Sequence, residues 1–301
     1  MSGFFPEGIY NFPFIQGFSF TWNDLRGPLP PQLVQMEHLV SVELHFNKFT
    51  GTIPTDWWHA RNLQRINLSG NMIVGSIATN IGTLTDMKGL FMFENELTGT
   101  LPEQMKNLAS LAYLRVSRNT LKGTIPSSLF QHWLSIEELW LHDNNFIGTI
   151  PSSVGYMNVS LNDFRLQANL MTGTLPGELY YLSQLSRLDL WNNSFSGTIS
   201  PSIINLAPNL RFFRINDNQF TGTLPKDMVN MTVLNTVWLQ GNNFVGSMPT
   251  GFCSLKGGYV LQDLSADCSK NTSSGHAELS CPSSCCTTCC NAEGLDCMPT
   301  N

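Results

Sequence analysis

Charged side chains are scarce in this sequence of 301 residues: Asp, Glu, Lys and Arg together make up 13%, and the net charge is −6. Such a chain lacks the clustered basic surface that neutralises nucleic-acid phosphates, so no nucleic-acid partner is expected. Long apolar runs are also missing, and none approaches the roughly 18 residues of a membrane-spanning helix. No basic segment followed by an apolar stretch opens the chain as a signal peptide would. Contact with a membrane is therefore expected only through segments outside this sequence.

Recognisable catalytic motifs are absent as well. The sequence contains no GxSxG, HExxH, P-loop or dinucleotide-binding fingerprint, and its six histidines share no metal-ligand spacing. We therefore predict that the protein is not an enzyme, and that it has no catalytic residue, no metal site and no cofactor.

Cysteine is absent before position 253, and eight cysteines then follow within residues 253–297. An even number at this density predicts either disulfides or a metal site. Zinc thiolate sites commonly use two separated CxxC motifs, whereas Cys286 and Cys289 form a CxxC that other cysteines flank directly. We predict disulfides, with zinc as the alternative; Cys253–Cys268 is the first pair to expect, and the pairing of the other six stays open. The predicted disulfide cysteines are Cys253, Cys268, Cys281, Cys285, Cys286, Cys289, Cys290 and Cys297.

One sequence frame, Asn-x-(Phe/Leu/Ile/Met)-x-Gly, recurs along the chain at spacings of 24 or 25 residues. A fixed period of this length indicates a solenoid of stacked repeats. Apolar residues stand five and three residues before each asparagine, such as Val42 and Leu44 before Asn47, so each repeat should contain a strand with one buried face. The asparagines should form a hydrogen-bonded ladder between stacked turns. This ladder consists of Asn23, Asn47, Asn71, Asn95, Asn119, Asn144, Asn169, Asn193, Asn218 and Asn242.

After the glycine, most repeats continue with Thr-(Ile/Leu)-Pro and then with apolar residues at helical spacing, which predict a short helical turn. These residues resemble the plant-specific class of leucine-rich repeats, LxxLxLxxNxLxGxIP, over about residues 3 to 250. The resemblance implies an α/β repeat solenoid: a leucine-rich-repeat horseshoe or superhelix with a concave parallel β-sheet, a second short sheet and convex 3-10 or short helical turns. Proteins of this class are typically receptor ectodomains or secreted recognition proteins.

The start of the chain falls inside a repeat, because residues 1–6 align with residues 171–176. A terminal repeat needs a polar cap, yet this one carries Phe4, Phe5, Phe12 and Phe14. We therefore expect residues 1–22 to be a truncated repeat of a longer protein, with a degenerate aromatic cap as the alternative. Residues 23–250 should form a solenoid of about ten repeats.

Residues 251–301 should form an irregular C-terminal cap and a cysteine-rich tail. The segment Leu-x-Ala-Asp-Cys and the cysteine block that follows resemble the C-terminal ends of diatom leucine-rich-repeat proteins. That resemblance implies an extracellular or cell-surface location for the full-length protein.

Side chains two, four and six residues before each ladder asparagine should face away from the core and line the concave sheet. Large aromatics and five of the nine arginines occupy these positions, and both types are enriched at binding hot spots. For single residues a structural role is the alternative: Trp140 stacked between Arg115 and Arg165, or a charge ladder that includes Asp189. The stripe as a whole predicts a ligand surface. Its predicted residues are Phe91, Phe93, Tyr113, Arg115, Trp140, His142, Arg165, Arg187, Asp189, Trp191, Phe212, Arg214 and Trp238.

These features together predict an extracellular recognition domain, such as the ectodomain of a receptor-like protein, that binds a protein, peptide or glycan on its concave face. The alternatives are a secreted inhibitor or adhesion protein that acts by occlusion, and an intracellular scaffold with a zinc-bound tail. Asn67 and Asn192 lie in glycosylation sequons that would place glycans on or beside the concave face. The five sequons begin at Asn67, Asn158, Asn192, Asn230 and Asn271.

Overall fold

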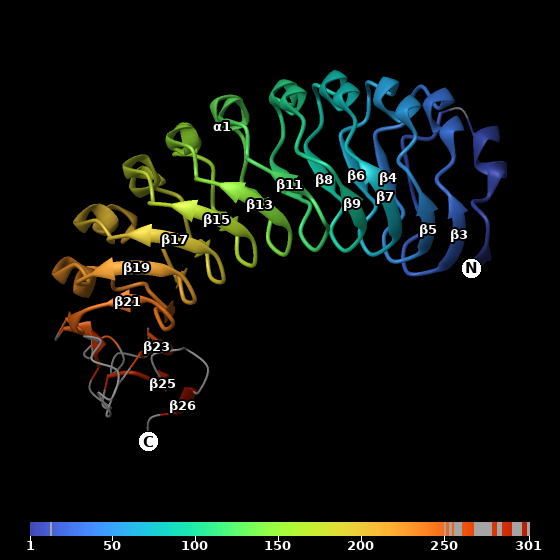
Figure 1. Ribbon diagram of the computed structural model, residues 1–301. Coiled ribbons are helices and arrows are strands. Elements are labelled where there is room, and N and C mark those ends of the chain that lie inside the picture. Colours follow the sequence, from blue (N-terminus) through green and yellow to red (C-terminus); the bar gives the residue numbers. More distant parts are fainter. Residues whose placement is uncertain are drawn as a thin grey trace. The chain divides into compact units, whose positions relative to one another are not determined.

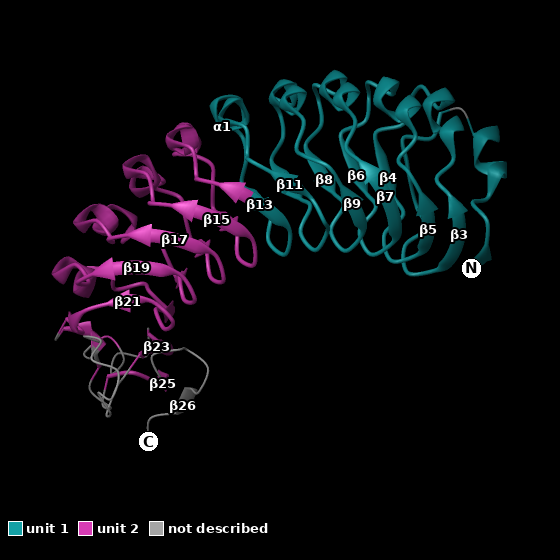
Figure 2. Ribbon diagram, in the orientation of Figure 1, with its two compact units in different colours: residues 1–146 teal, residues 147–301 magenta. Residues whose placement is uncertain are grey.

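The computed structural model describes residues 1–12, 14–249, 251–252, 255, 261–267, 279–281, 285–290 and 297–299. The chain divides into two compact units, Met1–Phe146 (unit 1) and Ile147–Asn301 (unit 2) (Figure 2). In both units, each regular repeat supplies a short strand, a second strand after the ladder asparagine, and a helical turn (Figure 1).

In unit 1 the strands form parallel sheets in which successive repeats are neighbours. The first sheet runs through β2 (Gly17–Ser19), β4 (Ser41–Glu43), β6 (Arg65–Asn67), β8 (Gly89–Phe91), β10 (Tyr113–Arg115) and β12 (Glu138–Trp140). The second sheet runs through β1 (Ser2–Gly3), β3 (Asp24–Pro28), β5 (Lys48–Gly51), β7 (Met72–Ser76) and β9 (Glu96–Thr98). In addition, β11 (Lys122–Gly123) pairs with the first residues of β13 (Asn145–Gly148).

Unit 2 repeats this arrangement. Its first-sheet strands are β14 (Asp163–Arg165), β16 (Arg187–Asp189), β18 (Phe212–Arg214), β20 (Thr236–Trp238), β23 (Asp263–Asp267), β25 (Thr288–Cys290) and the antiparallel β26 (Cys297–Pro299). Its second-sheet strands are β15 (Leu170–Gly173), β17 (Ser194–Gly197), β19 (Gln219–Gly222) and β21 (Asn243–Phe244), joined by the end of β13. A separate pair joins β22 (Gly246–Ser247) to β24 (Leu279–Ser280).

The strand register advances by one whole repeat at each step, so Leu114 lies beside Leu90 on one side and Leu139 on the other. Equivalent positions of successive repeats therefore form columns, and neighbouring residues within a column lie about 4.8 Å apart. The leucines of these strands are fully buried, because each repeat covers the apolar face of its neighbour.

The helical turns are short, and most follow a proline that fixes the backbone φ at the start of the turn, as Pro54 does at φ −60°. Of the ten turns named below, α1 is α-helical and the others are 3-10 helices; no helix of the described residues is long and apolar enough to cross a membrane. The predicted convex 3-10 or short helical turns are confirmed. They are η1 (Glu7–Asn11), η2 (Pro31–Gln35), η3 (Thr55–His59), η4 (Thr79–Thr83), η5 (Glu103–Asn107), α1 (Ser127–His132), η6 (Ser152–Met157), η7 (Gly177–Tyr181), η8 (Pro201–Leu206) and η9 (Lys226–Asn230).

The ladder asparagines tie neighbouring repeats together through their side chains. The Nδ2 group of Asn71 donates to the carbonyl oxygens of Leu44 and Leu68 at 3.1 and 2.9 Å, and its Oδ1 accepts from the backbone N–H of Phe49 at 3.0 Å. One amide thus satisfies backbone groups in two repeats, in a turn that has no strand partner for them.

The apolar side chains of the N-terminal repeat differ in their burial. Met1 aligns with Met171, which is buried, whereas Met1 is exposed. Phe4, Phe12 and Phe14 are exposed too, whereas Phe5 is buried. Phe5 packs against the rings of Tyr10, Phe18 and Phe20 with centroid separations of 5.7 to 6.0 Å. Of these four phenylalanines, one therefore belongs to the core and three lie at the surface.

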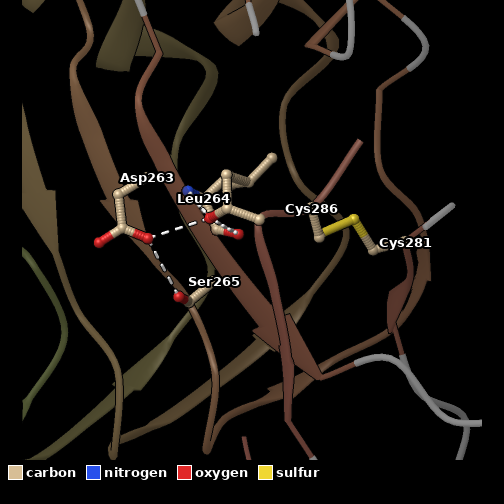
Figure 3. The surroundings of a disulfide bond; sticks show 6 residues. Asp263, Leu264, Ser265, Cys281 and Cys286 are labelled. Carbon is tan, nitrogen blue, oxygen red and sulfur yellow. Dashed lines mark hydrogen bonds between the residues drawn. A yellow bond between two sulfur atoms is a disulfide. The ribbon is translucent and has the colours of Figure 1, made fainter. Parts of the chain in front are cut away.

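The C-terminal tail contains a disulfide between Cys281 and Cys286, near strand residues Asp263 to Ser265 (Figure 3). Cys285, Cys289 and Cys290 are disulfide-bonded as well. A bonded sulfur is not a thiolate, so these five cysteines do not form the zinc ligands of the alternative prediction. The predicted partners Cys253 and Cys268, and the side chain of Cys297, lie outside the described residues.

We expect all eight cysteines to be bridged in protein secreted from a eukaryotic cell. Each bridge removes two hydrogen atoms, so eight bridged cysteines lower the intact mass by eight hydrogens relative to the reduced chain. Mass spectrometry under denaturing, non-reducing conditions measures this difference. Alkylation of any cysteine without prior reduction would show that the tail retains a free thiol.

Candidate ligand-binding face

Burial alternates along the first-sheet strands and defines a face opposite the core, here called the open face. In β12, Leu139 is buried, while Glu138 and Trp140 on either side are half-buried on the open face. The predicted ligand-binding residues lie on the open faces of the two units.

In unit 1 the prediction of an exposed Phe91 is wrong, because only 4% of this residue is exposed. The guanidinium carbons of Arg65 and Arg115 lie 4.2 and 5.4 Å from the centroid of its ring. Gly89, two residues earlier, leaves space for the ring, since a Cβ there would lie 2.5 Å from Phe91 Cε2. Alternation within one strand does not reveal this burial, because the long arginine side chains that cover Phe91 come from neighbouring repeats.

Arg115 also holds Trp140 in place. Its guanidinium carbon lies 3.8 Å from the centroid of the indole, and its Nε donates to Glu138 Oε2 at 2.8 Å. This contact matches one half of the structural alternative for Trp140, the cation–π stack on Arg115. Tyr113 donates its hydroxyl to Glu137 Oε2 at 2.7 Å, and that hydrogen bond raises the pKa of Tyr113.

Two further predicted residues of unit 1 differ in exposure. His142 is buried, contrary to its predicted place on an accessible surface, because the larger side chains of the open face enclose it. Phe93 is half-buried. On the open face of unit 1, the side chains of Arg65, Phe91, Arg115, Glu138 and Trp140 therefore contact one another through cation–π stacking and hydrogen bonding.

In unit 2 an ion-pair network crosses the first-sheet strands. Asp163 accepts two hydrogen bonds from Arg165, at 2.8 and 2.6 Å. Asp189 Oδ2 lies 3.6 Å from Arg187 Nη1 and 3.5 Å from Arg214 Nη1. The arrangement matches the charge ladder given above as the structural alternative.

Asp189 is only 1% exposed, so its predicted place on the accessible surface is wrong. Arg187 of the same strand and Arg214 of the next repeat flank it. Burial raises the pKa of the Asp189 carboxyl, against the opposing effect of the guanidinium groups of Arg214 and Arg187. Burial also lowers the pKa of Arg187, because desolvation disfavours its charged form.

Two of the three predicted aromatic residues of unit 2 are engaged with this network. Arg187 lies 4.0 Å from the centroid of Phe212, and Arg214 lies 4.5 Å from that of Trp238. The indole N–H of Trp238 donates to Asp263 Oδ2 at 2.6 Å. Trp191 differs: it is half-buried, and no ring or guanidinium group of the described residues stacks on it.

The column two residues before the ladder asparagines carries a second, polar feature in unit 2. Gln167 and Asn216 are buried, and Gln240 is half-buried. The oxygens Gln167 Oε1, Asn216 Oδ1 and Gln240 Oε1 have no hydrogen-bond partner within the part of the chain that the structure describes. A buried polar atom without a partner costs about 1–3 kcal/mol, so a ligand that pairs with these atoms would gain binding energy.

These amides stand outside the predicted site, although their spacing could have revealed them. Gln167, Trp191, Asn216 and Gln240 occupy one column of successive repeats, and three amides among four successive positions are as visible as the arginines. The role of Asp263 could not be foreseen, because β23 lies beyond the last repeat with a ladder asparagine.

The sequon asparagines differ in their exposure. Asn67 is buried and its Oδ1 accepts from Ser69 N at 3.2 Å, which leaves no access for a glycan, whereas Asn158, Asn192 and Asn230 are exposed. Asn271 lies outside the described residues. Over the described ranges, no group of three or more His, Cys, Asp or Glu side chains is arranged to hold a metal ion.

Comparison with known proteins agrees with this architecture. A family model described as Leucine Rich Repeat matches residues 62–84, 135–157 and 184–206. The structure of the plant peptide hormone receptor RGFR1 in complex with RGF2 has a TM-score of 0.83 and 28% sequence identity, and the match covers 93% of this chain and 42% of that chain. The fold is a leucine-rich-repeat solenoid.

Two further receptor structures are similar. The leucine-rich-repeat ectodomain of GASSHO1/SCHENGEN3 from Arabidopsis thaliana, in complex with CASPARIAN STRIP INTEGRITY FACTOR 2, gives a TM-score of 0.83 at 26% identity, over 94% of this chain and 33% of that chain. A TDR receptor gives a TM-score of 0.81 at 30% identity, over 86% of this chain and 44% of that chain. The leucine-rich-repeat chain thus spans less than half the length of these neighbours. No curated protein sequence matches it.

Proposed function

We propose that this chain is the ligand-recognition domain of a receptor-like protein at the cell surface, that it binds an extended peptide on the open face of unit 2, and that it has no catalytic activity. The observation that carries the proposal is the column of unpartnered amide oxygens at Gln167, Asn216 and Gln240. The similar receptors solved with peptide hormones support a peptide as the ligand class. The disulfide-bonded tail, which resembles that of diatom leucine-rich-repeat proteins, supports an oxidising, extracellular location.

An extended peptide supplies the groups that the amide column lacks. Its backbone N–H groups are donors at regular intervals. Asn216 and Gln240 each follow one of two adjacent strands, β18 and β20, that lie about 4.8 Å apart. Trp191 lies in the same column and offers an aromatic surface that no described residue stacks on. Aromatic residues of this kind are enriched among the residues that dominate binding energy.

The arginines of unit 2 are not free to act as simple anion receptors. Arg165 is held by Asp163, and Arg187 and Arg214 share Asp189. Because these charges are already paired, we expect peptide binding to depend on main-chain and aromatic contacts, and to change little with salt.

A linear peptide library displayed on phage tests the proposal. A selected peptide should bind the Asn216→Leu and Trp191→Ala variants at least thirtyfold more weakly than wild type, a loss of about 2 kcal/mol. Asn216→Leu removes a buried unpaired oxygen and also the hydrogen bond that Asn216 Nδ2 donates to Asp217 Oδ2, so the two effects oppose each other and its Tm, measured beside its affinity, should change little. Gln219→Ala, at an exposed position of the second sheet, is the matched control and should bind normally. Failure to select any peptide, or equal affinity for wild type and Asn216→Leu, would refute the proposal.

A further inference from the structure

The sequon Asn192-Asn193-Ser194 joins the open face of unit 2 to the second sheet. It begins directly after Trp191 and ends at the first residue of β17. Its two asparagines have different environments. Asn193 is a ladder residue, and its Nδ2 group donates to three backbone carbonyl oxygens at 3.0 to 3.3 Å. The ladder therefore holds the amide of Asn193, and the acceptor position of the sequon is the residue before it.

The side chain of Asn192 is accessible for modification. Asn192 is exposed, and its amide makes no hydrogen bond to any residue that the structure describes. Ala168 and Asp217 occupy the same position in the two adjacent repeats. Ala168 has a short side chain and Asp217 is exposed, so the neighbouring repeats leave room for a large group on Asn192.

The other sequons of the described residues lie elsewhere on the repeat. Asn67 is buried. Asn158 directly follows the turn η6, and Asn230 is the last residue of the turn η9. Glycans on these two residues would extend from the convex turns, away from the open face. Within the part of the chain that the structure describes, Asn192 alone combines an exposed sequon asparagine with a position beside the open face.

A glycan on Asn192 would occupy space next to the residues of the peptide face. Asn192 directly follows Trp191 in the chain, and its backbone N–H donates to the carbonyl oxygen of Asn216 at 3.1 Å. Trp191 and Asn216 both belong to the peptide face described above. Because an N-linked glycan is bulky and strongly solvated, it cannot pack beneath a ligand, and a peptide would have to reach Trp191 past it.

We propose that Asn192 is N-glycosylated and that the glycan restricts access of the peptide to Trp191. This inference rests on the proposed function for both its secretory route and its ligand. The glycan is transferred from a lipid-linked diphospho-oligosaccharide. A bond forms between Asn192 Nδ2 and C1 of the first sugar, and the bond from C1 to the diphosphate oxygen breaks. The lipid diphosphate leaves, and Nδ2 loses one proton. Ser194 supplies the hydroxyl that the acceptor sequon requires.

Glycopeptide mass spectrometry of the whole chain secreted from eukaryotic cells tests the modification. Asn192 should carry a glycan in wild type and in Ser194→Thr, which keeps a hydroxyl in the sequon. Ser194→Ala removes this hydroxyl and should leave Asn192 unmodified. The hydroxyl of Ser194 makes no hydrogen bond to another described residue, so the Tm of Ser194→Ala should lie within about 2 °C of that of wild type.

The Kd of a peptide for these proteins tests the restriction. The probe is a synthetic copy of a peptide selected from the phage library on the Ser194→Ala protein. Wild type and Ser194→Thr should bind it about tenfold or more weakly than Ser194→Ala does. Ser160→Ala removes the sequon of Asn158 on the convex side and is the matched control. It should bind the peptide with the affinity of wild type.

Each part of the inference has its own contrary result. An unmodified Asn192 in the secreted wild-type protein would overturn the glycan assignment. Equal affinity of glycosylated wild type and Ser194→Ala would overturn the restriction, although binding of the peptide would still support the proposed function. If no peptide could be selected on Ser194→Ala, the proposed function and the restriction would both fail, and the mass measurement would still decide the modification.

Discussion

Replacing Asp189 with alanine is expected to lower the free energy of unfolding by about 3 kcal/mol or more. The carboxylate is 1% exposed and lies within 3.6 Å of a guanidinium nitrogen of both Arg187 and Arg214. Without this carboxylate, the partly buried guanidinium groups of Arg187 and Arg214, on the adjacent strands β16 and β18, have no anion between them. Chemical denaturation of the two proteins measures the difference. Asp227→Ala, at an exposed position of unit 2, should change stability by less than about 0.5 kcal/mol.

The isosteric variant Asp189→Asn cannot titrate at this position. The difference in stability between wild type and this variant should therefore depend on pH, with a sign that follows from the raised pKa of Asp189. Because the folded-state pKa exceeds that of the unfolded chain, the folded protein takes up the proton first on acidification. The resulting stabilisation is complete below the unfolded value, near pH 3.8, and is lost as the pH rises through the folded value. The stability of wild type relative to Asp189→Asn should therefore increase as the pH falls through this window. A decrease would mean that the arginines, rather than burial, dominate the pKa of Asp189.

The repeated frame was sufficient to predict most of the architecture. The apolar residues before each asparagine form the first-sheet strands, and the residues after it form the second sheet, as in β15 and β17. This success has a physical basis. Each repeat contacts only its neighbours, so local periodicity determines the packing that elsewhere depends on contacts distant in the sequence.

The accessibility of the open face was harder to predict. Phe91 and Asp189 occupy outward positions of their strands, yet both are buried. Arginine side chains lie against both residues: Arg65 and Arg115 of the adjacent repeats at Phe91, and Arg187 of the same strand with Arg214 of the next repeat at Asp189. Their length lets them lie along the sheet instead of pointing into solvent. Alternation along one strand shows which face a residue lies on, and says nothing about what reaches over it from the next strand.

The stacked rings of Trp22 and Phe46 lay outside the predicted site for a different reason. Trp22 and Phe46 directly precede the ladder asparagine, outside the alternating columns that strand periodicity assigns to the open face. Their left-handed backbone turns the side chain away from the direction that an extended strand would give. The available signal was a large aromatic residue in a slot where other repeats place residues tolerant of positive φ.

The largest loss of stability that we expect from a single polar substitution is at the asparagine ladder, where Asn144→Ala should cost about 4 kcal/mol. The Nδ2 group of Asn144 donates to the carbonyl oxygens of Val116, Leu141 and His142 at 3.1, 3.1 and 3.2 Å. Its Oδ1 accepts from the backbone N–H of Leu121 at 3.0 Å. Its two N–H donors, one of them shared between two carbonyls, and its one acceptor make three full hydrogen bonds, worth about 3 kcal/mol at about 1 kcal/mol each, and the buried groups left unpaired supply the rest.

The adjacent asparagine provides a control of the same residue type. Asn145 is exposed at the start of β13, so Asn145→Ala should change the free energy of unfolding by less than about 0.5 kcal/mol. Denaturant unfolding of both variants separates the ladder from the general effect of removing an asparagine side chain. Equal stability of the two variants would show that the ladder bonds contribute no more than hydration of the same groups in the unfolded chain.

Asn144→Asp distinguishes hydrogen bonding from packing at this site. The substitution keeps the shape of the side chain and an acceptor for Leu121, but it places a carboxylate against the three carbonyl oxygens that Asn144 contacts as a donor. Repulsion among these oxygens should make Asn144→Asp less stable than Asn144→Ala at pH 7. Protonation restores one donor, so its stability relative to Asn144→Ala should recover at acidic pH. If shape alone mattered, Asn144→Asp would match wild type at every pH.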